Sequence, residues 1–384
     1  GGGTGGTGGG ITASGPRPCA VPSDAPGVTD DTITVGNIST ISGPVPGLGE
    51  PSVAGVRAYL AYRNAGGGVC GRRLELKSAD DGLENTRYRA AVADFAKSTL
   101  GLAGGFAGGD GGAIDLLTAN KMPAVMNAFN DAAQDAPTVF DINPPFKNRN
   151  AVTGKYTYLH QQGVRTASVA TIAQASSLSE LNQQVARMEA VGIRVVHRQE
   201  LPLSTLSYDA PARAVANSKA DYFLFLGAGN LNTSMARALY DTGYKLKFSE
   251  FLTAYGSDFI EGAGPGAEGV TSWTRSLPTE ETGNAQMKAF LEWMRRVAPG
   301  IPPDTFAADS WAAAKAFFDS VEAIPGPISR EALLAKLTSL TEYDADGFYG
   351  RINLGGRAAN GCSVAMRVEG GKWKRLTPST GFLC

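Results

Sequence analysis

The chain has 384 residues, a formal net charge of -1 at pH 7 and only 18% charged residues. This length exceeds that of a typical single domain, so two domains are expected. The near-neutral balance lacks the basic face that nucleic-acid binding requires. No apolar run reaches the length of about 18 residues that a membrane-spanning helix needs. The composition therefore predicts a globular protein with no nucleic-acid partner and no membrane span.

The first ten residues, GGGTGGTGGG, have the composition of a flexible linker. No signal peptide is recognisable, so the chain either starts after one was removed or never carried one. A glycine- and threonine-rich tail before a compact domain is typical of a protein tethered at its N-terminus. A remnant of an expression vector or a plain disordered terminus would look the same.

The four cysteines are Cys19, Cys70, Cys362 and Cys384. None lies in a CxxC pair and the chain has only two histidines, so we expect no zinc site. Two cysteines come early and two late, and the last one follows an apolar Gly-Phe-Leu, where it would hold a loose end. We predict the disulfides Cys19–Cys70 and Cys362–Cys384, which imply an oxidising compartment, whereas four free thiols would fit the cytosol.

Strand-like and helix-like segments alternate from residue 30 onward, which predicts a parallel sheet wrapped by helices. The expected strands are 31–38, 72–81, 100–106 and 123–129. The helices expected between them are 52–67, 84–98 and 112–121.

The pattern restarts near residue 150 and predicts a second doubly wound unit of similar size, so the fold class is α/β with two parallel-sheet lobes. The helices expected in this unit are 150–163, 178–192, 208–220 and 232–243. The strands expected there are 165–173, 193–199, 221–227 and 250–255.

A third segment is mainly helical and then ends in short β-like pieces. Its expected helices are 284–297, 304–321 and 329–340. The β-like pieces cover 350–356 and 362–376, and the glycine pair at 370–371 predicts a hairpin in the second piece.

The glycine-rich stretch GLAGGFAGGDGGAIDLL, residues 101–117, raises the question of a phosphate-binding loop. Such a loop requires a lysine and a hydroxyl residue, but Asp110 and two glycines stand in their place, and an aspartate would repel phosphate. A dinucleotide fingerprint fails as well, because the glycines follow the third strand with loose spacing. The stretch is therefore expected to be a wall of some other binding site.

Residues 30–81 carry a resemblance to a known family. A strand leads into Ser-Gly-Pro, a helix ends in Asn-x-Gly-Gly, and a Gly-Arg-x-Leu-Glu-Leu strand precedes two aspartates, here Ser42–Pro44, Asn64–Gly67, Gly71–Leu76 and Asp80–Asp81. This order resembles the opening of the type I periplasmic binding proteins, the branched-chain amino-acid-binding receptors of ABC importers. The later βα repeat fits the same family, so the resemblance covers residues 28–384.

The resemblance implies two α/β lobes joined by three crossovers, preceded by a flexible, disulfide-tethered segment 1–27. Lobe one would comprise 28–145 and 277–346, and lobe two 146–276 and 347–384. Such proteins close by hinge motion around a ligand. The resemblance also implies a small-molecule ligand, an ABC permease as partner, a monomer, no cofactor, and an extracytoplasmic location with a possible lipid anchor at the N-terminus.

Ligands of open α/β sheets bind beyond the carboxyl ends of the strands. In loop 41–50, the resemblance puts Leu48 over the ligand, and a purely structural turn is the alternative. The resemblance places Phe106 and the loop that follows it at the family's ligand-carboxylate site. There Ala107 and Gly108 replace hydroxyl residues, and free backbone N–H groups at a helix start would hold an anion. Asp110 would pair with a ligand amine or cap the helix.

Six further residues complete the implied site. Phe129 and Asn130 follow a strand, and Asn130 matches a ligand-binding hydroxyl of the family or forms an Asx-turn. The second lobe offers Ser176 and Ser177, which could also be helix N-caps, together with Asn230 and Tyr255. Because the family's amino-acid recognition set is only partly matched, an aromatic acid, an amide or another small polar solute also fits.

We therefore expect a non-catalytic receptor of an ABC importer that captures a small polar or amphipathic molecule. A ligand-sensing module of a signalling system is the alternative, and gene neighbourhood would separate the two. An enzyme is not expected, because His160 and His197 fall at expected surface positions and no Gly-x-Ser-x-Gly elbow is present. A hydrolase that uses carboxylates alone stays open at this point.

Overall fold

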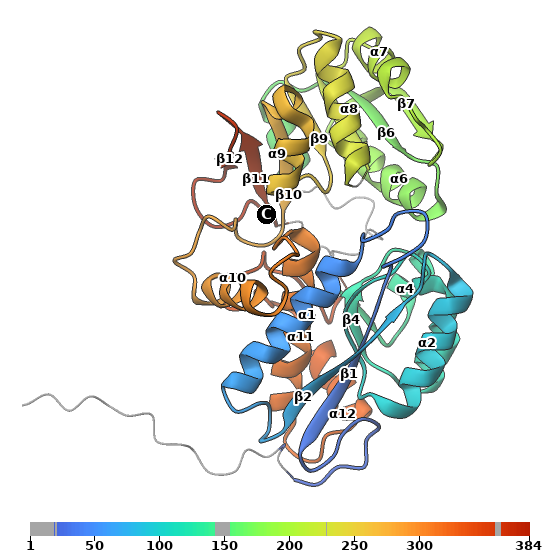
Figure 1. Ribbon diagram of the computed structural model, residues 1–384, viewed down its shortest axis with the longest axis vertical. Helices are drawn as coiled ribbons and strands as arrows, with labels where there is room; N and C mark the ends of the chain where they lie inside the picture. Colours follow the sequence, from blue (N-terminus) through green and yellow to red (C-terminus); the bar gives the residue numbers. More distant parts are fainter. Residues whose placement is uncertain (1–18, 20, 143–153, 228, 358–361) are drawn as a thin grey trace, which may run out of the picture.

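The computed structural model describes residues 19, 21–142, 154–227, 229–357 and 362–384, without the side chains of residues 175, 176 and 257. The glycine-rich tail and the beginning of the helix expected at 150–163 lie outside these residues. The described chain forms two α/β units, one above the other in Figure 1.

The first unit is built on a five-stranded parallel sheet with the order β2-β1-β3-β4-β5. Its strands are β1 (Thr32–Ser39), β2 (Arg73–Asp80), β3 (Leu102–Phe106), β4 (Ala124–Asn127) and β5 (Val139–Asp141). The central strands β3 and β4 are buried along their whole length. This burial explains their continuous apolar runs, because helices cover both faces of a parallel sheet.

Neighbouring residues of β4 lie in two separate hydrophobic cores. Val125 lies in the core beneath α1, whereas Ala124 and Met126 lie in the core beneath α2. The helices that the first half of the chain contributes are α1 (Glu50–Ala65), α2 (Asn85–Ser98), the 3-10 turn η2 (Asp110–Ala113), α3 (Ile114–Ala119) and α4 (Asp131–Asp135).

The third segment of the chain returns to the first unit, where α11 lies beside α1 (Figure 1). The returning helices are α10 (Ala285–Val297), α11 (Thr305–Glu322) and α12 (Arg330–Thr338). The two helices approach so closely at Gly55 that a Cβ there would stand 2.2 Å from the backbone oxygen of Ala307. Trp311 of α11 is fully buried in the core that this contact encloses.

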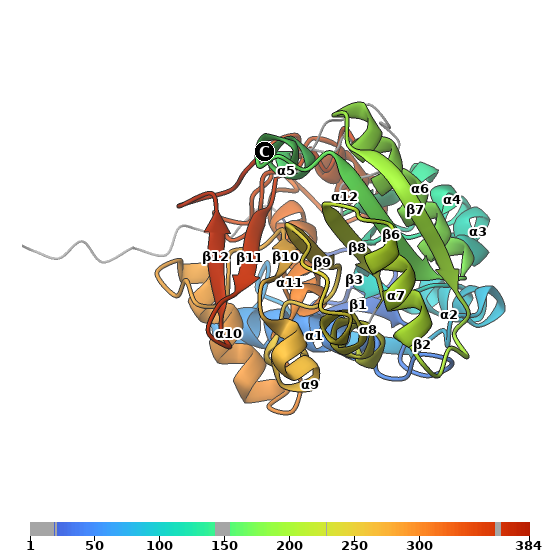
Figure 2. The same ribbon diagram turned by 90° about the horizontal axis from the view of Figure 1, so that it is seen from above.

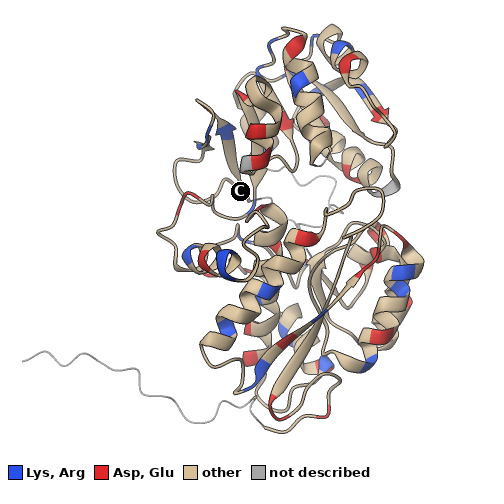
Figure 3. Ribbon diagram, viewed as in Figure 1, with Lys and Arg blue, Asp and Glu red and all other residues tan. Residues whose placement is uncertain are grey.

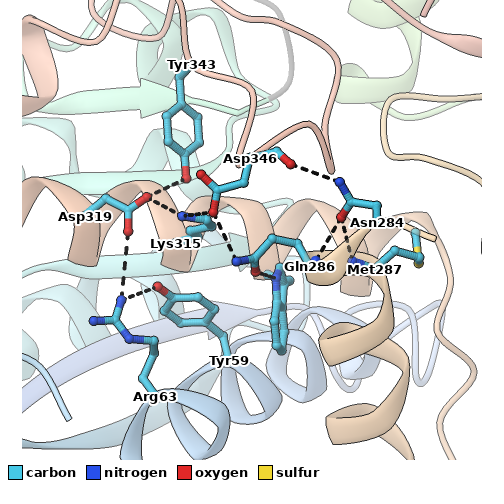
Figure 4. Close-up of polar contacts among 10 residues, drawn as sticks. Tyr59, Arg63, Asn284, Gln286, Met287, Lys315, Asp319, Tyr343 and Asp346 are labelled. Carbon is cyan, nitrogen blue, oxygen red and sulfur yellow. Dashed lines mark hydrogen bonds and ion pairs between the residues drawn. The ribbon is translucent and has the colours of Figure 1, made fainter. Parts of the chain in front are cut away.

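A polar cluster fixes the returning helices in place (Figure 4). Lys315 of α11 pairs with Asp319 at 2.7 Å and with Asp346 at 3.0 Å. Tyr343 donates to Asp319 at 3.3 Å, and Arg63 of α1 lies 3.9 Å from the same carboxylate. Burial opposes the charge of Lys315, but the two carboxylates outweigh it and raise the pKa of the ammonium group.

The second unit is built on a seven-stranded sheet with the order β12-β11-β10-β9-β8-β6-β7, which Figure 2 shows from above. Pairing is parallel from β7 to β10 and antiparallel between β10, β11 and β12. The strands are β6 (Thr166–Ile172), β7 (Arg194–Leu201), β8 (Tyr222–Leu226), β9 (Phe248–Phe251), β10 (Val270–Thr274), β11 (Val364–Val368) and β12 (Trp373–Thr377).

The helices of the second unit cover both faces of this sheet, over two cores. They are α5 (Gly154–Gln161), α6 (Ala175–Ala190), α7 (Asp209–Asn217), α8 (Asn230–Asp241), α9 (Ser257–Ala263) and the 3-10 turn η3 (Gly264–Ala267). None of the helices in the described part of the chain is both long and apolar enough to cross a membrane.

The predicted fold class is confirmed, and three details differ. Residues 350–356 form no strand, only an isolated bridge between Tyr343 and Ile352. The expected helix 112–121 begins instead as a 3-10 turn at Asp110. Strands β5 and β10 were missed because they are short and lack a clear alternation of apolar and polar residues.

The lobe boundaries stay a prediction, and the packing favours a later start for the last segment. Phe348, Tyr349 and Leu354 lie in the core of the first unit, although the expected second-lobe range begins at residue 347. The third crossover would accordingly follow Leu354.

Both predicted disulfides are present, Cys19–Cys70 and Cys362–Cys384. The first is reinforced by the buried guanidinium of Arg72, which donates to the backbone oxygens of Cys19 and Val21, each at 3.0 Å. The pairing of all four cysteines fits an oxidising, extracytoplasmic compartment.

Candidate functional site

A cavity of about 220 Å³ lies between the two units, where the carboxyl ends of their parallel strands face one another. The first unit contributes Phe106 from the end of β3. The second unit contributes Ile172 and Leu226 from the ends of β6 and β8. Phe306, at the start of α11, belongs to the returning segment. This is the edge at which open α/β sheets bind their ligands.

The wall from the first unit is apolar and centred on three phenylalanines. The ring of Phe106 lies 4.0 Å from that of Phe306 and 4.5 Å from that of Phe129, between centroids. These tilted and edge-on contacts keep the rings in place as a group, which we call the phenylalanine cluster. The other apolar side chains of the cavity are Val45, Leu48, Leu83, Ile172, Leu203, Leu226, Leu231, Leu252 and Trp273.

One face of α6 supplies polar side chains to the opposite wall. Ser177, Glu180, Gln184 and Arg187 line the cavity, and their spacing of three, four and three residues puts them on one side of a helix. Gln184 donates to Glu180 at 2.6 Å. Burial raises the pKa of the Glu180 carboxyl and lowers the pKa of the Arg187 guanidinium.

A buried ion pair lies beside this polar face. The ammonium group of Lys155 in α5 lies 2.5 Å from one carboxylate oxygen of Glu250 in β9. The hydroxyl of Tyr222 donates to the other oxygen at 2.5 Å. Both oxygens of Glu250 therefore have partners within the protein.

Arg275 lies on the crossover that follows β10 and reaches from the cavity into the first unit. Its Nε donates to the hydroxyl of Tyr349 at 3.1 Å, and its Nη2 donates to Asp309 of α11 at 3.3 Å. Tyr349 in turn donates to Asp309 at 2.7 Å. Burial opposes the charge of Arg275, but Tyr349 and Asp309 outweigh burial and raise the pKa of the guanidinium.

The glycine-rich stretch is shaped by close packing. A Cβ on Gly104, whose φ is +66°, would lie 2.4 Å from Val56, and one on Gly109 would lie 2.7 Å from the backbone oxygen of Glu84. Glycine is required at Gly104 by the positive φ and by the Val56 side chain, and at Gly109 because the backbone of Glu84 fills the space.

Two backbone N–H groups of this loop have acceptors within the protein. Gly108 donates to the hydroxyl of Thr40 at 3.0 Å, and Gly109 donates to the carboxylate of Asp81 at 2.7 Å. Thr40 also donates to Asp81 at 2.7 Å. These internal acceptors occupy two of the donors that were expected to hold an anion.

The structure does not place Asp110 in the cavity lining or as the cap of η2. Its side chain is fully buried and is not among those that line the cavity, and η2 has no side-chain cap. Its carboxylate accepts the backbone N–H of Phe129 at 2.7 Å and that of Asn130 at 3.2 Å. Asp110 thus holds the loop that carries Phe129.

Five of the expected ligand-binding residues line the cavity: Leu48, Phe106, Gly108, Phe129 and Ser177. Their role in binding stays a prediction. Ser176 was also expected to bind the ligand, and the structure does not describe its side chain.

The other expected residues lie elsewhere. Ala107 belongs to the core beneath α2, and Asn130 donates to the backbone oxygen of Gly108 at 3.2 Å. Asn230 is exposed at the start of α8. Tyr255 is buried, and its hydroxyl donates to Glu280 at 2.6 Å, beside the second crossover.

Sequence reasoning missed the polar face of α6, Lys155, Glu250 and Arg275. The spacing of polar residues in SSLSELNQQVAR was the available signal for α6, but it does not say which face meets the cavity. Arg275 gave no local signal at all.

Both histidines are half-buried and lie away from the cavity. The Nδ1 atom of His197 lies 2.8 Å from the hydroxyl of Ser168 on the neighbouring strand. In the part of the chain that is described, no group of three or more His, Cys, Asp or Glu side chains could hold a metal ion.

A family model described as a periplasmic binding protein matches residues 32–372. The chain belongs to this family. Its fold is that of the type I periplasmic binding proteins. A search of curated proteins found no significant match to this sequence.

Three solved structures illustrate the likeness of this periplasmic binding protein to others. A fatty acid ABC transporter substrate-binding protein from Thermomonospora curvata has a TM-score of 0.78 at 18% identity, covering 93% of this chain and 94% of that one. A possible leucine/isoleucine/valine-binding protein from Rhodopirellula baltica gives 0.75 at 15% identity, with 93% and 98% covered. A leucine-binding protein from Thermotoga maritima gives 0.72 at 18% identity, with 90% and 98% covered.

At sequence identities of 15–18%, the structural likeness establishes the fold but does not identify the ligand. The family and these neighbours are solute-binding and receptor proteins, not enzymes.

Acidic and basic residues are interspersed over the helices of both units in the view of Figure 3.

Proposed function

We propose that this periplasmic binding protein is the substrate-binding receptor of an ABC importer and captures a small amphipathic molecule between its two units. The observation that carries the proposal is the cavity, whose lining comes from both units and combines an apolar wall with buried charged groups. Apolar lining with a few fixed polar groups is typical of small-molecule sites.

The division of the cavity lining between the two units supports closure by hinge motion. Phe106 and Phe129 come from the first unit, and Ile172 and Leu226 from the second. A ligand that contacts both walls stabilises the closed arrangement relative to an open one, because only the closed arrangement offers it both sets of contacts.

Two structural neighbours support a transport role, and their names give two different ligand classes. One is a fatty acid ABC transporter substrate-binding protein and another is a leucine-binding protein. The proposal includes an ABC permease as partner, a monomeric receptor and a possible lipid anchor at the N-terminus. Co-purification with the permease, light scattering and mass spectrometry of the native N-terminus test these three parts.

A thermal-shift screen of amino acids, fatty acids, aromatic acids and amides tests the proposal. A ligand present at one hundred times its Kd should add about 2.7 kcal/mol to the free energy of unfolding and raise Tm. Small-angle scattering should show a smaller radius of gyration with that ligand. If no compound in a broad screen raises Tm and none compacts the protein, the proposal is wrong.

A further inference from the structure

We infer that the ligand is an amphipathic monocarboxylate without an α-ammonium group, with its carboxylate on Arg275 and its apolar chain or ring against the phenylalanine cluster. This inference rests on the proposed function, because it takes the cavity between the units as the ligand site. It names a ligand class that the fold alone leaves open.

The cavity fits an apolar body of modest size. Its volume of about 220 Å³ lies below the roughly 300–1,000 Å³ that is typical of pockets for drug-sized ligands, which favours a small ligand. Twelve apolar side chains line it: those of the phenylalanine cluster, and Val45, Leu48, Leu83, Ile172, Leu203, Leu226, Leu231, Leu252 and Trp273.

The two acidic side chains of the cavity are poorly suited to hold an ammonium group. Glu250 already accepts from Lys155 and Tyr222 with its two oxygens, each at 2.5 Å. Glu180 accepts from Gln184, and burial raises the pKa of its carboxyl, which favours the neutral form. A ligand amine would therefore lose its hydration without gaining a dedicated carboxylate.

Two backbone donors of the loop that follows β3 are already used within the first unit. Gly108 and Gly109 donate to Thr40 and Asp81, and Asp110 takes the N–H groups of Phe129 and Asn130. The polar side of the cavity offers an anionic ligand group charged donors instead.

Arg275 provides such donors. A guanidinium carries five N–H groups, of which Arg275 uses Nε for Tyr349 and Nη2 for Asp309. Nη1 makes no hydrogen bond to another described residue, and the side chain, 25% exposed, lines the cavity. The contact with Asp309, at 3.3 Å, is longer than the usual 2.7–2.9 Å of a charge-assisted hydrogen bond, and the carboxylate of Asp141 also acts on the Arg275 charge.

The charged lining as a whole also favours an anion. Three cationic side chains, Lys155, Arg187 and Arg275, face two acidic ones, Glu180 and Glu250. Tyr349 and Asp309 of the first unit hold Arg275, which lies on the crossover after β10. A carboxylate bound to Arg275 would therefore link this crossover to both units. Binding of the head group would in this way be coupled to closure.

Isothermal titration of the full chain with matched probes tests the inference. The probes are octanoate and 3-phenylpropionate, each with its primary amide, together with octylamine and L-leucine. At least one carboxylate should bind at least tenfold more tightly than its own amide, and octylamine and L-leucine should give no measurable heat. Because each acid differs from its own amide only in the head group, this comparison needs no variant.

Arg275→Gln adds a second, independent readout. It should weaken binding of the carboxylate at least tenfold while leaving the affinity for the amide within about twofold, a pattern that a general loss of folding cannot produce. Arg351→Gln is the matched control, because Arg351 is exposed, pairs with Glu342 and lies outside the cavity. The control should bind every probe like the wild type.

The outcomes separate this inference from the proposed function. Equal affinity for acid and amide, or preferential binding of L-leucine or octylamine, overturns the monocarboxylate assignment and leaves a receptor. If no carboxylate probe binds while another compound of the broad screen does, the assignment is likewise overturned. If nothing binds and nothing compacts the protein, both the inference and the proposed function fail.

Discussion

The carboxylate of Asp110 accepts the backbone N–H of Phe129 at 2.7 Å, across the loops that follow β3 and β4. Phe129 in turn meets Phe106 edge-on. A buried charged group thus holds part of the apolar wall of the cavity without lining it. Burial raises the pKa of Asp110 to about 6, against the opposing effect of the hydrogen bonds from Asn130 and Phe129.

This pKa predicts a specific dependence of stability on pH. The pKa of an unfolded aspartate is about 3.9, so between about pH 4 and pH 6 the folded protein binds the proton that the unfolded chain has lost. The free energy of unfolding should therefore fall as pH rises through this window, by up to about 3 kcal/mol from this group. Asp110→Asn should remove that fall, measured by urea unfolding at pH 4, 5, 6 and 7.

Asp115→Asn is the control for this prediction. Asp115 is exposed, and its hydrogen bonds with Arg89 lower its pKa, so its contribution to stability is small and grows with pH instead. A D110N variant that keeps the full fall in stability between pH 4 and 6 would assign that fall to another group.

Removal of a ring from the phenylalanine cluster should weaken binding more than folding. Phe306 is half-buried beside Phe106, and Phe306→Ala should raise the Kd of the best ligand of the thermal-shift screen by about tenfold, since loss of a ring contact removes on the order of 1–2 kcal/mol. Phe318 is fully buried in the core beneath α1, and Phe318→Ala should cost about 3–5 kcal/mol of folding stability instead. Calorimetric titration and urea unfolding of both variants distinguish the two effects.

The two disulfides should differ in their effect on binding. They close loops with sequence separations of 51 and 22 residues, so removal of either should cost about 3–4 kcal/mol of folding stability. Only Cys362 lines the cavity. The double substitution Cys362→Ala with Cys384→Ala should weaken ligand binding, whereas Cys19→Ala with Cys70→Ala should leave the Kd of the folded protein unchanged. Equal effects of the two double variants on Kd would contradict this.

The contact between α1 and α11 should not tolerate a methyl group at Gly55. A Cβ there would stand 2.2 Å from the backbone oxygen of Ala307, so Gly55→Ala must separate two helices and should cost about 1–3 kcal/mol. Gly66 ends the same helix at the surface, and a Cβ on it would have its nearest neighbour at 3.4 Å. Gly66→Ala should accordingly change Tm little. Similar Tm values for the two variants would show that the helices adjust without cost.

The candidate site could be predicted only in part. The sequence placed Leu48, Phe106 and Phe129 near a ligand, and all three line the cavity, because each follows or ends a strand at the carboxyl edge of a parallel sheet. The structure does not place Asp110 in that lining, because its carboxylate accepts the N–H of Phe129, 19 residues later in the chain. No local pattern reports such a partner.

By itself the sequence determined the alternation of helices and strands, the two parallel sheets and the disulfide pairing, because periodicity, turn residues and cysteine positions can be recognised in short segments. Only the tertiary structure decided which side chains line the cavity. The face that α6 turns inward, the position of Arg275 between Asp309 and the cavity, and the use of the loop's donors by Asp81 all depend on packing between distant segments. The glycine-rich loop after β3 therefore lies at the site, where its backbone packs closely against neighbouring segments. The charged side chains of the cavity come from elsewhere in the chain.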